Sequence, residues 1–401
     1  MKVLLMMSDT GGGHRASAQA IAAALKQVSP DVETEVVDAI QEVSPFWRAV
    51  VGLYGPIIRA APWLWGMLFK VFGGGGGAWL WGITARVVAW TVRGRLVPYV
   101  DRKHPDVLCS THPLINQIAQ TGRERYARER GRRLPLVVVV TDPVTFHPSW
   151  IEPRADLTVV ATVEARDAAV RYGADPAKVR VLGLPIRPDF AGAEGVARDE
   201  NAERREARAS LGISTDASVV LITGGGEGLA TLPEVVDAVL ALPGAPVVLA
   251  VAGRHERTLQ RLKERMDAIS SGRLLPFGFT DKMGTLMRAC DVIVTKAGPG
   301  TMFEAMALGL PMVIMGALPG QEAGNVELVV KDNLGRVAMG GPHDVARAVQ
   351  DVLAHPEERA GMARRAQQRA TPHAALGIAR ALLARGATPS PDEDRDMKAA
   401  G

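Results

Sequence analysis

The sequence predicts an α/β fold made of two similar domains, each with a parallel sheet and alternating helices. Three stretches predict it, because each reads as a short apolar strand, a glycine-rich turn and the start of a helix. They are residues 2–27, 218–228 and 291–308. The first two repeat one plan at the start of each half of the chain. We therefore expect two Rossmann-like domains that face each other across a cleft.

Composition agrees with a globular protein of several α/β units. The 401 residues suggest two to three domains, and 42 glycines and 26 prolines indicate many turns. Cys109 and Cys290 each stand at an end of an apolar run, which favours buried free thiols in a reducing compartment. We expect no signal peptide and no membrane span, since the first strand leads into a glycine loop and no apolar run reaches about eighteen residues.

The first strand, Lys2–Met7, leads into a glycine loop and an alanine-rich helix over Ala18–Gln27. The loop lacks the spacing of the dinucleotide fingerprint, but Gly12 and Gly13 would let the backbone approach a bound molecule closely. His14 would lie at the helix N-terminus, where the helix dipole disfavours imidazolium. A neutral imidazole can accept a proton, so His14 is our candidate general base. The alternative is a capping or structural histidine.

The stretch from Val43 to Val100 has six cations, no carboxylate and six of the seven tryptophans. Tryptophan prefers the headgroup level of a bilayer, and basic amphipathic segments are drawn to anionic lipid. We interpret this stretch as an inserted membrane-docking element. The alternatives are a tryptophan-rich core and an oligomer interface. The residues expected to dock are Arg48, Arg59, Trp63, Trp65, Lys70, Trp79, Trp81 and Arg86.

Further strands are expected at 106–109, 134–140, 157–161 and 179–182, and polar residues follow the first two. Parallel sheets of this kind bind ligands at the carboxyl ends of their strands. Thr111, His112, Asp142 and His147 are accordingly pocket candidates, although each alone could be a turn residue. The proline-stiffened stretch 183–190 reads as a domain crossing. The expected parts are residues 1–187, residues 188–386 with two closing helices, and a disordered tail over 387–401.

The turn over 296–300 is followed by a helix that Thr301 is expected to cap. Free amides and the positive end of a helix dipole attract an anion such as a diphosphate. Glu304 lies one helical turn further, at a reach that suits the two hydroxyls of a ribose. This arrangement fits a nucleotide diphosphate, and the alternative is an ordinary capped helix.

Six motifs, read together in their order along the chain, resemble those of the monogalactosyldiacylglycerol synthases and processive diacylglycerol glucosyltransferases. The motifs occupy residues 8–17, 140–142, 147–150, 224–228, 295–301 and 319–325. The resemblance implies the GT-B arrangement of two facing Rossmann-like domains. It also implies inverting transfer of a sugar from UDP without an obligatory metal, and therefore no cofactor. No Asp-x-Asp metal pair stands in a suitable loop.

Carried onto this sequence, the resemblance makes His14 the base for the acceptor hydroxyl and places Gly12, Gly13, His112, Asp142 and His147 around the acceptor. Phe279 and Thr280 would lie near the uracil, Glu304 would bind the ribose, and Gln321, Glu322 and Asn325 would contact the sugar. The diphosphate would be held by Gly224, Gly225, Gly226, Glu227, Gly228, Gly300 and Thr301, and Gly298 is a further donor-binding candidate. One departure from the family is the glycine run 73–77 inside the docking stretch, which leaves the acceptor open.

The expected partners are UDP-glucose or UDP-galactose, a diacylglycerol-type lipid and an anionic membrane surface, with no nucleic acid. The expected location is the cytoplasmic face of the cell membrane. Three alternatives remain open: a transferase with another lipid-linked or small-molecule acceptor, a sugar-nucleotide epimerase, and a non-catalytic binding protein.

Overall fold

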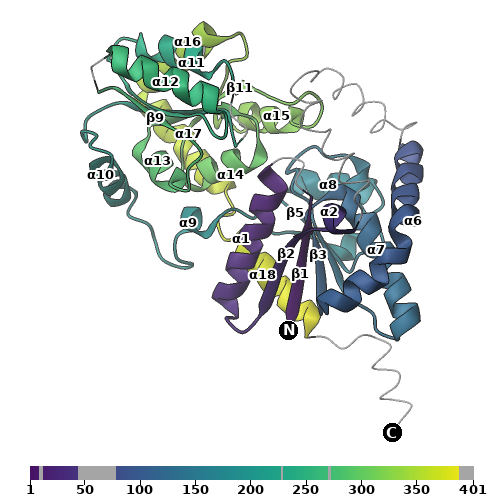
Figure 1. The fold of residues 1–401 in the computed structure, drawn as a ribbon. Helices are drawn as coiled ribbons and strands as arrows, with labels where there is room; N and C mark the ends of the chain where they lie inside the picture. The colour runs from purple at the N-terminus through teal and green to yellow at the C-terminus, as the bar shows by residue number, and fades with distance from the viewer. Residues whose placement is uncertain (9–11, 44–77, 227–228, 270–271, 388–401) are drawn as a thin grey trace. The chain divides into compact units, whose positions relative to one another are not determined.

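The computed structural model describes residues 1–8, 12–43, 78–226, 229–269 and 272–387. These residues form two compact units (Figure 1). The first contains residues 1–188, 319–321 and the chain from 373 onward, and the second contains residues 189–318 and 322–372. Each unit is built around its own six-stranded sheet in which all strands are parallel.

The sheet of the first unit has the order β2-β1-β3-β4-β5-β6. Its strands are β1 (Lys2–Met7), β2 (Glu33–Asp38), β3 (Val107–Ser110), β4 (Leu136–Val139), β5 (Leu157–Val160) and β6 (Val179–Val181). Its helices are α1 (Gly12–Val28), α2 (Ala39–Val43), α6 (Ala78–Lys103), α7 (Pro113–Arg130), α8 (Val163–Arg171) and α18 (Ala374–Gly386), with short 3-10 turns η1 (Pro148–Trp150) and η2 (Pro176–Lys178).

Both faces of this sheet are covered, because successive strand residues point to opposite sides. On β1, Leu4 and Met6 join a core with residues of α6 and α7, whereas Leu5 and Met7 join a core with α1 and α18. Each fully buried aliphatic side chain contributes roughly 1.5–3 kcal/mol, so the near-continuous apolar strands account for the layered fold.

The sheet of the second unit has the order β12-β11-β10-β7-β8-β9. Its strands are β7 (Val219–Thr223), β8 (Val247–Val251), β9 (Leu274–Phe277), β10 (Val292–Lys296), β11 (Met312–Gly316) and β12 (Gly335–Val337). Its helices are α9 (Pro188–Ala191), α10 (Glu200–Ser210), α11 (Leu232–Leu240), α12 (Glu256–Ile269), α13 (Met283–Ala289), α14 (Pro299–Ala307), α15 (Ala323–Lys331), α16 (Pro342–Ala354) and α17 (Pro356–Arg369).

One helix belongs to a different unit from the one that we predicted. We expected the second domain to extend to residue 386, which would include α18. In the structure it groups with the first unit, where Leu376, Ile378 and Leu382 are buried in the core that also holds Ile21 of α1. The apolar stripe of α18 explains this placement, since α1 and the β3 region supply the surface that buries it.

The stretch that we interpreted as a docking insertion ends inside the core. From Val92 to Val100, helix α6 buries Val92, Leu96, Val97 and Tyr99 against α7 and the sheet. This part of α6 is a crossover helix of the α/β layer, which corrects the insertion boundary near residue 100. Trp90, two residues before Val92, is exposed.

Candidate functional site

The strand order of each sheet reverses at one point, and some of the candidate residues follow the strands on either side of it. In the first unit the reversal lies between β1 and β3, and in the second it lies between β7 and β10. Loops that leave such a switch point diverge to opposite faces of the sheet and open a crevice at the carboxyl ends of the strands. His14 follows β1 and His112 follows β3, whereas the second glycine loop follows β7 and Gly298 follows β10.

The imidazole of His14 is held in a defined orientation in the first turn of α1. Its Nδ1 lies 2.8 Å from the backbone carbonyl oxygen of Thr111 and 3.0 Å from the hydroxyl of Thr141. A carbonyl oxygen can only accept, so Nδ1 carries the proton and donates it. The neutral ring therefore has its basic lone pair on Nε2. The helix begins at Gly12, earlier than we predicted, so the amides of its first turn disfavour a positive charge on this ring.

Aromatic rings surround His14 on two sides. The ring of His112 meets it edge-on at 4.6 Å between centroids, and the indole of Trp150 lies 5.8 Å away. His112 is buried, and burial together with the neighbouring His14 holds its pKa well below the usual range. Its Nδ1 accepts the backbone N–H of Leu114 as the cap of α7. His112 thus packs against the candidate base and caps a helix.

Asp142 and Trp150 form a buried, hydrogen-bonded pair, and the indole of Trp150 lies beside His14. The indole Nε1–H of Trp150 donates to Oδ2 of Asp142 at 2.7 Å, and the Trp150 carbonyl accepts from the side chain of Asn116 at 2.8 Å. Burial raises the pKa of Asp142 to about 6. His147 caps the short turn η1 by accepting the N–H of Ser149. Thr141 and Trp150 were not among the predicted site residues, although both stand within the motifs at 140–142 and 147–150.

The raised pKa of Asp142 predicts how stability depends on pH. Between its ordinary value of 3.8 and about 6, the native carboxyl holds a proton that the unfolded chain has released. Stability should therefore fall as pH rises through this window, by about 2–3 kcal/mol from this group. Asp142→Asn keeps an oxygen for the Trp150 indole and should abolish that fall.

Urea unfolding at several pH values between 4 and 7 measures the effect. The control is Asp31→Asn, the same charge change at an exposed turn residue. Parallel pH curves for wild type and Asp142→Asn would contradict the assignment.

The second glycine loop, residues 224–228, packs against the loop that follows β8 in its described part, residues 224–226. Gly225 has a φ of +82° and Gly253 a φ of +61°, the left-handed region that favours glycine. The backbone N–H of Arg254 donates to the Gly226 carbonyl at 2.9 Å. This contact shapes residues 224–226, and Gly224 is buried while Gly226 is exposed. Glu227 and Gly228 lie outside the described residues.

Helix α14 begins at Pro299, so the residue at the cap position is Gly298, and no side chain caps it. Our expectation that Thr301 caps the helix is wrong, because proline fixes the helical φ two residues earlier. The backbone N–H groups of Gly300 and Thr301 belong to the first turn, where no intrahelical acceptor is available. Glu304 lies one turn on and is half-buried.

Two cations, Lys296 and Arg254, flank the glycine loop of the second unit, and neither was a predicted site residue. A Cβ placed on Gly225 would lie 3.8 Å from Cε of Lys296, and one placed on Gly226 would lie 3.6 Å from a guanidinium nitrogen of Arg254. The Arg254 guanidinium stacks over the exposed ring of Phe279 at 4.1 Å. Lysine and arginine beside exposed backbone amides form an environment that suits a diphosphate. Thr280, next to Phe279, accepts the backbone N–H of Lys282.

The polar loop after β11 supports the turn before α14. Asn325 is buried, and its side-chain amide donates to the carbonyl of Ala297 at 2.8 Å. Oε2 of Glu322 accepts the N–H of Leu318 at 2.7 Å, and its other oxygen lies 3.9 Å from where a Cβ on Gly298 would stand. Gln321 is half-buried in the same loop. Asn325 thus fixes the backbone of the turn, a role that differs from the sugar contact that we expected.

Two family models cover most of the chain. The model for monogalactosyldiacylglycerol (MGDG) synthase matches residues 14–186, and that for the glycosyltransferase family 28 C-terminal domain matches residues 219–376. A monogalactosyldiacylglycerol synthase 2 of Oryza sativa subsp. indica, named as probable and chloroplastic, is 33% identical over 86% of this chain and 72% of its own length. The chain belongs to the monogalactosyldiacylglycerol synthase family. This confirms the resemblance that the motifs indicated.

A second relative of this synthase family is the probable chloroplastic monogalactosyldiacylglycerol synthase of Glycine max. It is 32% identical over 87% of this chain, and the chain spans 64% of its length. The structure is also similar to that of Anabaena HepE in complex with UDP-glucose, with a TM-score of 0.54, 16% identity and coverage of 96% and 99%. The fold is the GT-B type, as predicted.

The names of these relatives overturn one prediction about this synthase-family chain. We expected the cytoplasmic face of the cell membrane, whereas the soybean and rice relatives are both named as chloroplastic. Separately, the described part of the chain contains no helix that is long and apolar enough to cross a membrane.

The predicted docking residues of this synthase-family chain remain a prediction. Arg48, Arg59, Trp63, Trp65 and Lys70 lie outside the described residues. Trp79, Trp81 and Arg86 lie on α6, in its first turns, where the structure describes the backbone. Among the described residues, one group has ligand atoms close enough for a metal: Asp351, His355 and Glu358, at the junction of α16 and α17.

Proposed function

We propose that this chain is a metal-independent, inverting glycosyltransferase that moves a hexose from a UDP-sugar to diacylglycerol or a glycosyl-diacylglycerol. The observation that carries the proposal is the fixed tautomer of His14, whose Nδ1 is tied to the Thr111 carbonyl within a matched synthase domain. A base of this kind is what attack by a lipid hydroxyl requires. The relatives' names favour galactose as the hexose and diacylglycerol as the acceptor.

In the proposed reaction, Nε2 of His14 removes the proton of the acceptor hydroxyl as its oxygen attacks the anomeric carbon. The bond from that carbon to the diphosphate oxygen breaks, and UDP leaves with the bonding electron pair. Attack opposite to the leaving group inverts the anomeric configuration. The first-turn amides of α14, together with Lys296 and Arg254, would stabilise the charge that develops on UDP. This electrostatic set supports a reaction that needs no divalent ion.

One incubation series tests the whole proposal. Purified protein is mixed with labelled UDP-galactose or UDP-glucose, with neutral vesicles that contain or lack diacylglycerol, and with or without a chelator. We expect label in the lipid only when diacylglycerol is present, undiminished by the chelator, and NMR of the product should show the inverted anomer. Epimer formation without lipid, transfer only to another acceptor, or binding without turnover would each refute the proposal.

A further inference from the structure

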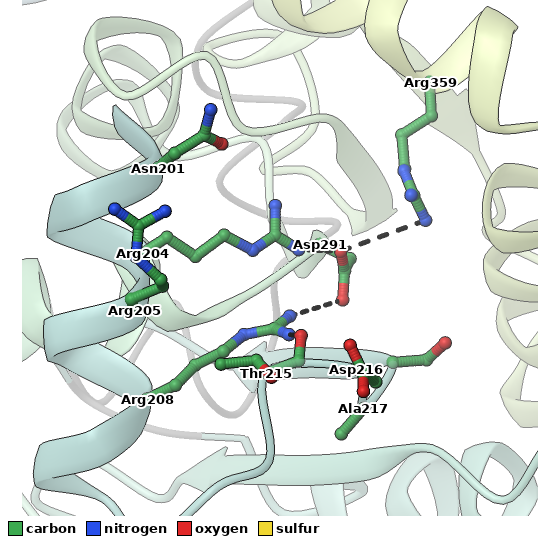
Figure 2. A pocket seen from close by; sticks show the side chains of 10 residues that line it. Asn201, Arg204, Arg205, Arg208, Thr215, Asp216, Ala217, Asp291 and Arg359 are labelled. Carbon is green, nitrogen blue, oxygen red and sulfur yellow. Dashed lines mark hydrogen bonds and ion pairs between the residues drawn. The ribbon is translucent and has the colours of Figure 1, made fainter. Parts of the chain in front are cut away.

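The second unit contains a cavity that the proposed reaction does not use. It has a volume of about 400 Å³ and lies between α10, the turn before β7 and the start of α17 (Figure 2). Ser218 precedes β7 and Asp291 precedes β10, so the cavity lies at the amino ends of these strands. The glycine loop and Gly298 follow the same two strands at their carboxyl ends. The cavity is therefore separate from the candidate diphosphate site.

Positive charge exceeds negative charge in the lining of this cavity. Four arginines and two aspartates are among its lining residues, namely Arg204, Arg205, Arg208, Arg359, Asp216 and Asp291. Three of the four arginines converge on Asp291 alone, as Figure 2 shows. One carboxylate cannot neutralise three guanidinium groups, so a surplus remains where water is partly excluded.

Arg208 explains how this cluster is held in place. It is buried, and its guanidinium donates to the carbonyls of Ala289 and Thr215 as well as to Asp291. Oδ2 of Asp291 also accepts the backbone N–H of Val219 at 2.8 Å. Burial and the neighbouring charge of Arg204 both lower the pKa of Arg208. Arg208 and Asp291 thus form a structural pair whose hydrogen bonds are already taken.

The other arginines keep donors for a ligand. Nitrogen NH1 of Arg359 lies 3.9 Å from Asp291, beyond hydrogen-bond distance, and Figure 2 shows it reaching towards the cavity from the opposite wall. Arg205 is exposed and has no ion pair among the described residues. Arg204 gives one of its nitrogens to Asp291. Each guanidinium carries five N–H donors in a planar fork that matches the oxygens of a phosphate.

We infer that this cavity binds a phosphate group, either as a free phosphate or diphosphate or as the headgroup of a phosphorylated lipid. A multivalent oxyanion would neutralise the surplus charge and accept from Arg205, Arg359 and the remaining donors of Arg204. A neutral sugar or an apolar ligand would leave the charge surplus uncompensated. The inference stands independently of the proposed transferase reaction.

The test uses the full chain without nucleotide, and the cavity variant below separates this cavity from the candidate diphosphate site. Inorganic phosphate and diphosphate are titrated by calorimetry at low and high salt. The variant is Arg205→Gln combined with Arg359→Gln, which leaves the Arg208–Asp291 pair intact. The control is Arg347→Gln together with Arg364→Gln, the same loss of charge on α16 and α17 outside the cavity lining.

We expect saturable binding that weakens with salt, that falls about tenfold or more in the cavity variant, and that is unchanged in the control. Flotation on neutral vesicles with and without a phosphate-monoester lipid identifies the source. Flotation that needs this lipid, is lost in the cavity variant and is competed by free phosphate assigns a headgroup. No flotation, with binding of free phosphate, assigns a soluble ligand. Absence of binding in both arms, or equal binding by the cavity variant, overturns the inference.

Discussion

His14→Ala should reduce glycosyl transfer by about a hundredfold to ten thousandfold while UDP binding remains unchanged. The reason is that alanine removes Nε2, the atom that would take the proton from the acceptor hydroxyl. The residues that we propose for the diphosphate follow β7 and β10, on other loops than His14, so the substitution does not change them. Turnover is measured by label transfer to diacylglycerol and UDP affinity by calorimetry.

Two further variants separate a base from a structural histidine. Thr141→Val removes the hydroxyl 3.0 Å from Nδ1 but leaves the carbonyl of Thr111 in place, so it should lower turnover less than His14→Ala does. His343→Ala changes an exposed histidine of α16 and should change nothing. Turnover by His14→Ala within about tenfold of wild type would contradict the base assignment. Equal losses of turnover and of UDP affinity would indicate misfolding instead.

The sequence was most informative about the strands and the loops that follow them. Continuous apolar runs such as Val219–Thr223 are typical of strands buried on both faces, and glycine turns mark their carboxyl ends. Because parallel strands share an edge, the positions of His14 and of the turn before α14 followed from the order of strands and loops. Periodicity and turn chemistry are local properties, and this is why they could be read without a structure.

Contacts between segments distant in the chain could not be predicted in this way. Lys296 and Arg254 flank the glycine loop only because β7, β8 and β10 are neighbours in the sheet. The placement of α18 in the first unit likewise depends on a distant contact, because its apolar side chains are buried against α1 and the first sheet. Thr301 was misassigned for a local reason, since Pro299 at the first helical position outweighed a favourable capping residue.

The contact between the glycine loop and the loop after β8 leads to the second large prediction. Gly253→Ala should weaken UDP binding at least tenfold and destabilise the second unit. A Cβ at this position would lie 2.6 Å from the carbonyl oxygen of Gly226 and 2.7 Å from that of Gly225, closer than such contacts allow. Both oxygens are backbone atoms, so relieving the clash must shift the two loops relative to each other, and the Arg254–Gly226 hydrogen bond joins them. The amides that would contact a diphosphate move with the glycine loop.

Gly244→Ala is the matched control because it separates backbone strain from the steric clash. Gly244 also has a positive φ, +85°, but a Cβ there would meet nothing within 4 Å. Each substitution should cost about 1–2 kcal/mol for a left-handed alanine. Only Gly253→Ala should add the clash and the loss of UDP affinity. Urea unfolding and calorimetry with UDP measure the two effects. If Gly253→Ala binds UDP as tightly as Gly244→Ala does, the glycine loop does not hold the diphosphate.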